Sequence, residues 1–359
     1  MTVRGPIGRA CVAMLACTAL TSCTTPLDTD HAQASSQAAA NSRLAEPETI
    51  AGGLDVPWSI AFHEGTTLIS ERDSARIVEL DQDGNTREVG TVGGVEGDGE
   101  GGLLGITVKD GYLFAYSTGA GENRIGRYKL TGSAGSLELS SREKILDGIP
   151  SAGIHNGGRI AFGPDGMLYA TAGDAGNTDN AQDLDSLGGK ILRMTAEGAV
   201  PEGNPFPDSL VYSYGHRNPQ GIAWATDDTM YASEFGQSTW DELNIIEAGS
   251  NYGWPEVEGI AEQDGYVDPV QQWEPSEASP SGIAVTDGAI FIANLRGERL
   301  REVPLSDPST STEHFVGEYG RLRDVTVAPD GAVWMLTNNT DGRGDPAPED
   351  DRLLSIDLD

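Results

Sequence analysis

One histidine, one aspartate and a set of arginines are the residues of this acidic chain best suited to chemistry. His155 begins one apolar segment, and Asp174 follows the next apolar segment along the chain. A carboxylate beside an imidazole fixes the tautomer of the ring and stabilises the imidazolium, an arrangement typical of a general base. The sequence predicts such a base if a hairpin brings the two residues side by side.

The arginines of interest stand in short polar motifs at the ends of apolar segments. They are Arg217, Arg296, Arg321 and Arg323, and His216 flanks the first of them. Guanidinium groups bind carboxylates and phosphates through forked hydrogen bonds. Gathered on one face, they would bind a polyanionic small molecule; scattered, they would only form surface ion pairs of small energetic value.

Six copies of one hairpin are the elements that must position these residues. In each copy a short apolar strand leads through a turn, often Asp-Gly, into a second strand, and the copies start roughly 40 to 60 residues apart. This turn chemistry is a strong hairpin signal, and the spacing leaves room for two more strands per unit. We therefore predict an all-β six-bladed β-propeller with four-stranded antiparallel blades, closed by residues 352–356; an unrelated β-sandwich is the alternative.

The hairpins gather the polar residues at one end. In an antiparallel hairpin the start of the first strand lies beside the end of the second. Glu100, His155, Asp174 and the four arginines all fall at such shared ends. If these strands are innermost, the six ends surround the axis, and the sequence predicts one functional pocket there.

The N-terminal segment predicts export. Residues 1–22 have a basic start and a short apolar stretch, and Leu20-Thr-Ser-Cys23 resembles the bacterial lipobox in which Cys23 is acylated. We interpret 1–22 as a lipoprotein signal peptide, 23–48 as a disordered tether and 49–359 as the catalytic propeller. The protein would then be an exported cell-envelope lipoprotein, bound to the membrane only through Cys23.

The overall charge limits the classes of partner. The chain has 23 Lys and Arg against 56 Asp and Glu, a formal net charge of −33. Such a surface repels nucleic acid and anionic lipid. We expect no nucleic-acid partner.

At the polar motifs the sequence resembles the soluble quinoprotein glucose/sorbosone dehydrogenase family, most closely its aldose sugar dehydrogenase branch. The resemblance covers roughly residues 54–357. It is carried by His155-Asn-Gly-Gly-Arg-Ile with Gly173-Asp174, Tyr214-Gly-His-Arg-Asn-Pro-Gln-Gly221, Asn251-Tyr-Gly-Trp-Pro255 and Arg321-Leu-Arg-Asp324.

The resemblance implies pyrroloquinoline quinone (PQQ) on the axial face and an aldose as substrate. His155 matches the base that takes the anomeric proton while hydride passes to the quinone, and Asp174 matches its orienting acid. The product would be a lactone, and the sequence leaves the electron acceptor open. Arg217 and Asn218 match residues that contact the cofactor and polarise its quinone oxygens, and the resemblance therefore implies a catalytic role for Arg217. The implied cofactor-binding residues are Glu100, Arg217, Asn218, Asn294, Leu295, Arg296, Arg321, Leu322 and Arg323.

The resemblance also implies calcium. The carbonyls of Gly236 and Gln237 match ligands that help to hold PQQ, and Glu242 with the carbonyl of Tyr252 resembles a second calcium position. Gln237 replaces a proline of the family, and Glu100 stands where some members have glutamine.

Two other functions stay open at this stage. A calcium-dependent propeller hydrolase, such as a lactonase, would have a carboxylate-rich metal centre on the axis. A non-catalytic binding propeller would present apolar patches on a rim and would not need His155 beside Asp174.

Overall fold

Strands make up nearly all of the regular structure. The structure is a computed structural model that describes residues 1–2 and 44–358. Residues 3–22 of the predicted signal peptide, Cys23 and most of the predicted tether lie outside the described residues. One four-residue helix, α1 (Asp179–Gln182), interrupts the β architecture. In the described part of the chain, no helix has the length and apolarity needed to cross a membrane.

The first three sheets follow one another in chain order. Blade one consists of β2 (Pro57–His63), β3 (Thr66–Glu71), β4 (Arg76–Leu80) and β5 (Thr86–Thr91). Blade two consists of β6 (Leu103–Lys109), β7 (Tyr112–Gly119), β8 (Glu122–Thr131) and β10 (Glu143–Ile149), with the two-residue strand β9 (Glu138–Leu139) added beside β8. Blade three consists of β11 (Ile160–Phe162), β12 (Leu168–Ala172), β13 (Lys190–Met194) and β14 (Val211–Tyr214).

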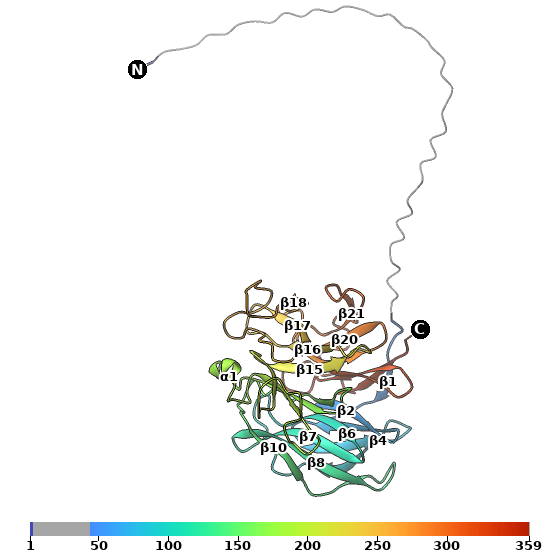
Figure 1. The fold of residues 1–359 in the computed structure, drawn as a ribbon. Helices are drawn as coiled ribbons and strands as arrows, with labels where there is room; N and C mark the ends of the chain where they lie inside the picture. Colours follow the sequence, from blue (N-terminus) through green and yellow to red (C-terminus); the bar gives the residue numbers. More distant parts are fainter. Residues whose placement is uncertain (3–43, 359) are drawn as a thin grey trace, which may run out of the picture. The chain divides into compact units, whose positions relative to one another are not determined.

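The other three sheets complete the ring (Figure 1). Blade four consists of β15 (Pro219–Trp224), β16 (Met230–Glu234), β17 (Asp241–Ile246) and β18 (Gln271–Trp273). Blade five consists of β19 (Pro280–Val285), β20 (Ala289–Asn294), β21 (Arg299–Pro304) and β22 (Thr312–His314). Blade six consists of β23 (Leu322–Val327), β24 (Val333–Thr337), β25 (Leu353–Ile356) and β1 (Glu48–Ala51).

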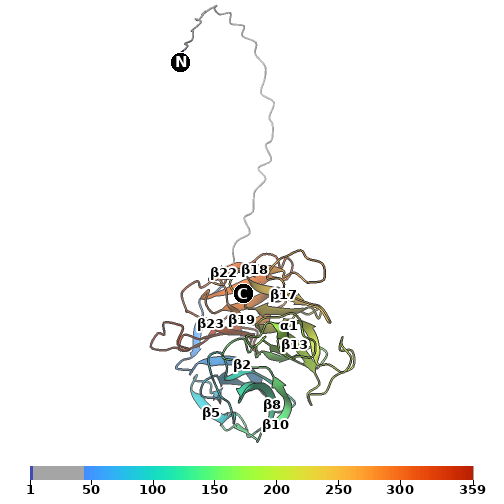
Figure 2. The same cartoon turned by 90° about the vertical axis from the view of Figure 1, so that its left-hand side faces the viewer.

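The first strand of each blade lies innermost. These six strands contact one another in a closed ring, from β2 through β6, β11, β15, β19 and β23 back to β2. Figure 2 shows β2, β19 and β23 near the centre, with β5, β10, β18 and β22 at the periphery. The predicted six-bladed propeller is confirmed, and β9 is the one strand of the described residues beyond four per blade.

Residues 352–356 close the ring as predicted. β25 pairs antiparallel with both β24 and β1, so that the last strand joins the first strand of the fold in one sheet. Glu48 pairs with Ser355, and Leu353, Leu354 and Ile356 are fully buried. The two ends of the described body are therefore held together by a single blade.

Stacking of the blades explains the continuous apolar runs in the second strands. Every residue of β3, β12, β16 and β20 is buried, because a neighbouring blade covers each face.

The Asp-Gly turn of a hairpin has the backbone conformation that its sequence predicts. At the β6–β7 turn Asp110 and Gly111 both have positive φ (51° and 76°), the conformation that favours Asp-Gly.

One position of the inner strand recurs around the axis. It is occupied in blade order by Ser59, Gly105, Arg159, Gly221, Gly282 and Asp324. Arg159 and Asp324 come from opposite blades and form a buried ion pair with an Nη1–Oδ1 distance of 3.0 Å. Gly282 makes room for this axial pair, because a Cβ there would lie 2.0 Å from Asp324 Oδ1.

Candidate active site

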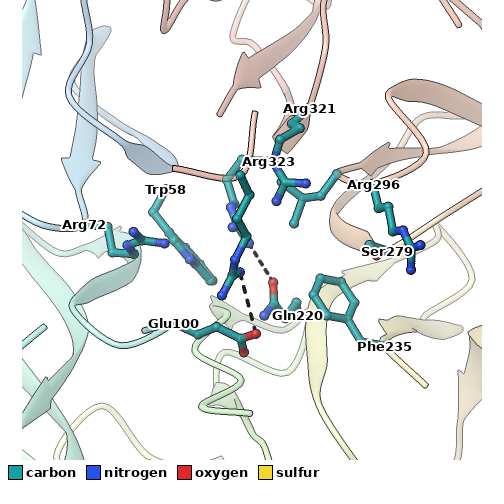
Figure 3. A pocket seen from close by; sticks show the side chains of 11 residues that line it. Trp58, Arg72, Glu100, Gln220, Phe235, Ser279, Arg296, Arg321 and Arg323 are labelled. Carbon is teal, nitrogen blue, oxygen red and sulfur yellow. Dashed lines mark hydrogen bonds and ion pairs between the residues drawn. The ribbon is translucent and has the colours of Figure 1, made fainter. Parts of the chain in front are cut away.

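A cavity of about 360 Å³ opens on the axial face at the predicted end of the hairpins. Five guanidinium groups and a single carboxylate line it, and Figure 3 shows Arg72, Arg321 and Arg323 with Glu100 around it. Its lining residues are Trp58, Arg72, Glu100, Gln220, Phe235, Ser279, Leu295, Arg296, Arg321, Arg323 and Arg343. Of the predicted rim residues, Glu100, Arg296, Arg321 and Arg323 line this cavity, whereas His155, Asp174 and Arg217 are not among its lining residues.

Two kinds of chain position supply most of this lining. Trp58, Gln220 and Arg323 lie near the start of the inner strands β2, β15 and β23. Arg72 and Phe235 directly follow the second strands β3 and β16. Hairpin geometry brings these two kinds of position together at the axis.

Arg323 has the most unusual environment of the five arginines. It is buried, and its hydrogen-bond partners are the neutral side chains of Asn338, Gln220 and Ser281. No ion-pair partner for it is found in the part of the chain that the structure describes. Burial, together with the like charges of Arg72 and Arg321, lowers the pKa of Arg323 to about 9. A buried cation without a counter-charge favours an anionic ligand.

The other arginines retain binding capacity as well. Arg321 Nη2 lies 3.2 Å from Asp341 Oδ2, but its buried Nε–H has no partner among the described residues. Arg72 pairs with Asp73 at 2.6 Å. Arg296 is exposed at the cavity edge.

Aromatic rings give the cavity flat walls. Trp58 and Phe235 both line it. The Arg159 guanidinium lies 4.2 Å from the centroid of the Trp58 ring, so the axial ion pair packs against this wall. Flat apolar walls with guanidinium groups at the edges suit a planar aromatic anion.

His155 and Asp174 are side by side, as the sequence predicted. His155 Nδ1 lies 2.7 Å from Asp174 Oδ1, and Asp174 is fully buried. Asp174 Oδ2 accepts a hydrogen bond from Trp254 Nε1 at 2.8 Å. Burial alone would raise the pKa of Asp174, but the hydrogen bonds from His155, Trp254 and the Gly176 amide lower it below its usual value. An ionised Asp174 makes Nδ1 the protonated nitrogen, which leaves Nε2 of His155 as the basic atom.

Glu100 joins this pair to the cavity. Its Oε2 accepts a hydrogen bond from the His155 amide at 2.9 Å and a longer one from Asn218 Nδ2 at 3.5 Å. Its Oε1 lies 3.8 Å from Arg343 Nη1. Glu100 therefore holds the backbone of His155, which has a positive φ of 55°.

Arg217 and Asn218 lie against the same pair. The Arg217 carbonyl accepts a hydrogen bond from the Asp174 amide at 2.8 Å. The Arg217 side chain donates to the carbonyls of Phe235 and Gly236, and its guanidinium lies 5.5 Å from the Trp254 ring centroid. Burial lowers the pKa of Arg217, and nearby Asp174 and Glu234 oppose that effect.

The remaining predicted cofactor residues occupy different places. Leu295 lines the cavity with Arg296. Asn294 is buried, and its Nδ2 donates to the Ile292 carbonyl at 2.9 Å. Leu322 is buried in a core cluster that includes Val325 and is not among the cavity-lining residues.

The predicted calcium ligands lie in blade four, with Glu242 in strand β17 and Gly236, Gln237 and Tyr252 in the segments on either side of that strand. The Gly236 carbonyl accepts a hydrogen bond from Arg217, and the Gln237 amide donates to Glu258 at 2.7 Å. Burial, and then the charge of Glu234, raises the pKa of Glu242 to about 8, a situation that a bound cation would relieve. Tyr252, whose carbonyl is the other predicted ligand, is buried, and its hydroxyl donates to the Ile245 carbonyl of β17 at 2.7 Å. The described residues contain no group of three or more His, Cys, Asp or Glu side chains arranged for a metal.

Several site residues were not predicted from the sequence. They are Trp58, Arg72, Gln220, Phe235, Ser279, Trp254 and Arg343. Arg72 and Gln220 occupy shared hairpin ends, so their positions in the repeat could have identified them as site residues. Trp254 and Arg343 come from long loops outside the repeat, where no repeat register places a side chain.

Comparison with known proteins places the chain among sugar dehydrogenases. The PQQ-bound aldose sugar dehydrogenase of Streptomyces coelicolor has a similar structure, with a TM-score of 0.83 and 50% identity over 86% of this chain and 96% of that chain. Aldose sugar dehydrogenase YliI of Escherichia coli is 29% identical over 82% of this chain and 90% of its own length. The glucose/sorbosone dehydrogenase family model matches residues 54–346. The chain belongs to the glucose/sorbosone dehydrogenase family.

Proposed function

We propose that this protein is a quinoprotein that oxidises the anomeric hydroxyl of aldose sugars to lactones with PQQ as hydride acceptor. One observation supports this proposal above all: the cavity contains the buried guanidinium of Arg323, which has no carboxylate partner among the described residues. Glu100, which also lines the cavity, accepts a hydrogen bond from the amide of His155, and His155 in turn contacts Asp174. The PQQ-bound relative and the family membership support the same assignment.

The cavity suits the cofactor in charge and in shape. PQQ is a planar aromatic tricarboxylate. Arg296, Arg321 and Arg323 would bind its carboxylates, and Trp58 and Phe235 would flank its rings. When bound, PQQ supplies an electrophilic quinone that accepts a hydride.

The protein's own residues would handle the proton. His155 Nε2 would accept the proton of the anomeric hydroxyl as general base, since Nδ1 is engaged with Asp174. The buried carboxylate of Asp174 would stabilise the imidazolium that forms. Arg217 would place a positive charge where negative charge develops.

Calcium, export and attachment through Cys23 are parts of the proposal that rest on sequence resemblance. The raised pKa of Glu242 supports a cation in blade four. The lipobox at residues 20–23 supports an exported, lipid-anchored protein.

Reconstitution of the purified protein with PQQ and calcium tests the function. We expect oxidation of aldoses with an artificial electron acceptor. His155→Ala should lower kcat about 10²- to 10⁴-fold, because it removes the general base. Arg323→Gln should weaken PQQ binding, measured by quenching of tryptophan fluorescence. Absence of sugar oxidation in the fully loaded parent would refute the proposal.

A hydrolase is the less favoured alternative. Such an enzyme would place several carboxylates around an axial metal, whereas one carboxylate and five guanidinium groups line this cavity. Hydrolysis of a lactone by the protein without PQQ would favour this alternative.

A further inference from the structure

A buried row of three hydrogen-bonded side chains lies beside Arg217 and Asn218. Ser213 Oγ lies 2.8 Å from His216 Nε2, and His216 Nδ1 lies 2.8 Å from Glu234 Oε2. The order serine, histidine, carboxylate is that of a hydrolase triad. Ser213 and His216 have no exposed surface and Glu234 is 4% exposed, so no substrate can reach the serine. The row must have another role.

The second oxygen of Glu234 faces the proposed active site. Glu234 Oε1 accepts a hydrogen bond from the amide of Arg217 and another, at 3.2 Å, from the amide of Asn218. Glu234 is the last residue of β16 and lies opposite Pro219, the first residue of β15. One carboxylate therefore fixes two consecutive amides of the segment that enters β15, while the histidine holds its other oxygen.

The same segment touches the catalytic pair on its other side. The Arg217 carbonyl accepts from the Asp174 amide at 2.8 Å, and Asn218 Oδ1 accepts from the Gly157 amide at 3.0 Å. The segment thus lies between Glu234 and the loops that carry His155 and Asp174. A shift of its backbone would move Arg217 relative to the base.

The Arg217 side chain is held by the two residues that directly follow Glu234 in the chain. Its Nη1 donates to the carbonyls of Phe235 and Gly236, and its buried Nε has no partner among the described residues. No carboxylate ion pair to Arg217 is found in that part of the chain. Glu234 and the carbonyls of Phe235 and Gly236 therefore hold the backbone and the guanidinium of Arg217 from one stretch of chain.

We propose that Glu234, oriented by His216 and Ser213, is a positioning residue that fixes Arg217 and Asn218 against the reacting groups. The proposal rests on the proposed function, because it assigns the row a task in that site. It makes Ser213 a hydrogen-bonding anchor rather than a nucleophile.

The test compares two glutamates at equivalent places. Glu71 ends β3 as Glu234 ends β16, each lies opposite a proline of the inner strand, and both are buried. Glu71 instead contacts the Asp55 amide, Ser74 and Arg76. Glu234→Gln should lower kcat about 10- to 100-fold in the PQQ-loaded enzyme, with the sugar KM changed less than threefold. Glu71→Gln should leave both values near those of the parent.

Hydrogen exchange in the apoprotein tests, without cofactor, whether Glu234 holds the backbone of residues 214–220. A peptide that covers residues 214–220 should exchange at least tenfold faster in Glu234→Gln than in the parent, and equally fast in Glu71→Gln and the parent. Unchanged exchange would overturn the proposal, even if the parent oxidised sugar. Faster exchange in Glu234→Gln, together with a PQQ-loaded parent that oxidised no sugar, would support the positioning role of Glu234 and refute the proposed function.

Two further variants separate positioning from general damage. In a background that carries both Arg217→Ala and Asn218→Ala, Glu234→Gln should lower kcat less than threefold further, because both side chains that it positions are gone. A full additional loss would mean a role elsewhere and overturn the proposal. If Glu234→Gln does not fold, Ser213→Ala serves instead, because it removes only the hydrogen bond between Ser213 and His216. This variant should lower kcat about threefold and speed up exchange at residues 214–220. No change in either quantity would overturn it.

Discussion

At the scale of single residues, Asp174 combines full burial with an ionised carboxylate. Its Oδ1 accepts from His155 Nδ1 and from the Gly176 amide, each at 2.7 Å, and its Oδ2 accepts from Trp254. Burial opposes the charge, and the three donors more than compensate, so the pKa of Asp174 is lowered. The orientation of the base is thereby coupled to the stability of the fold.

This coupling predicts a pH-dependent effect of Asp174→Asn. The folded state has the lower Asp174 pKa and binds fewer protons than the unfolded state as the pH falls through the usual aspartate range. The stabilisation is present above that range and is lost as the pH falls through the folded-state value. We expect the variant to cost about 1–3 kcal/mol at pH 7 and clearly less at pH 3, in urea unfolding. An equal cost at both pH values would contradict the assignment.

The sequence predicted most of the charged site residues because the hairpin repeat gives each a register. His155 and Arg217 shortly precede an inner strand and Arg323 lies at the start of one, and turn chemistry fixes which strand ends meet. Trp254 reaches Asp174 from 80 positions along the chain, through a loop that no local pattern specifies. Such long-range loop contacts depend on tertiary packing, which is why they could not be predicted.

At the scale of elements, close packing of the inner strands depends on glycines at the axis. A Cβ added to Gly282 would lie 2.0 Å from Asp324 Oδ1 and 2.8 Å from Asp324 Cα. Asp324 is buried, pairs with Arg159, and accepts a hydrogen bond from the Ile60 amide at 3.0 Å. A displaced Asp324 would disturb three blades together.

We therefore expect Gly282→Ala to lower the free energy of unfolding by about 1–3 kcal/mol, because the methyl group overpacks the axis. Gly288 lies in the same blade with no atom within 4 Å of an added Cβ and without a positive φ. Gly288→Ala should be neutral or raise stability by about 0.4–1 kcal/mol. Denaturant titration of both variants checks this, and equal losses would argue against axial crowding.

At the scale of the whole molecule, closure depends on one strand that joins both ends of the fold. β25 separates β24 from β1 and buries Leu353, Leu354 and Ile356. Burial of each such side chain stabilises a protein by about 1.5–3 kcal/mol. Their sum approaches the total stability of an ordinary domain, about 5–15 kcal/mol.

Deletion of residues 353–359 should therefore prevent folding. Without β25, the edge of β24 is exposed and β1 has no partner, so blade six cannot stack on blade one. We expect loss of soluble protein and of the β signal in circular dichroism. As a control, Leu354→Met conserves volume and should cost less than about 1.5 kcal/mol. A soluble, cooperatively unfolding truncated chain would show that the ring closes without this strand.

The pairing of Glu48 with Ser355 has a consequence for chain connectivity. Since first and last strands are neighbours, a short linker can join them without crossing the body, and new termini can be opened elsewhere. The tight turn at Asp110–Gly111, between β6 and β7, is a suitable place for the cut. A circularly permuted chain would keep every blade and the same axial cavity, so the order in which the blades are synthesised is separable from the architecture that they form.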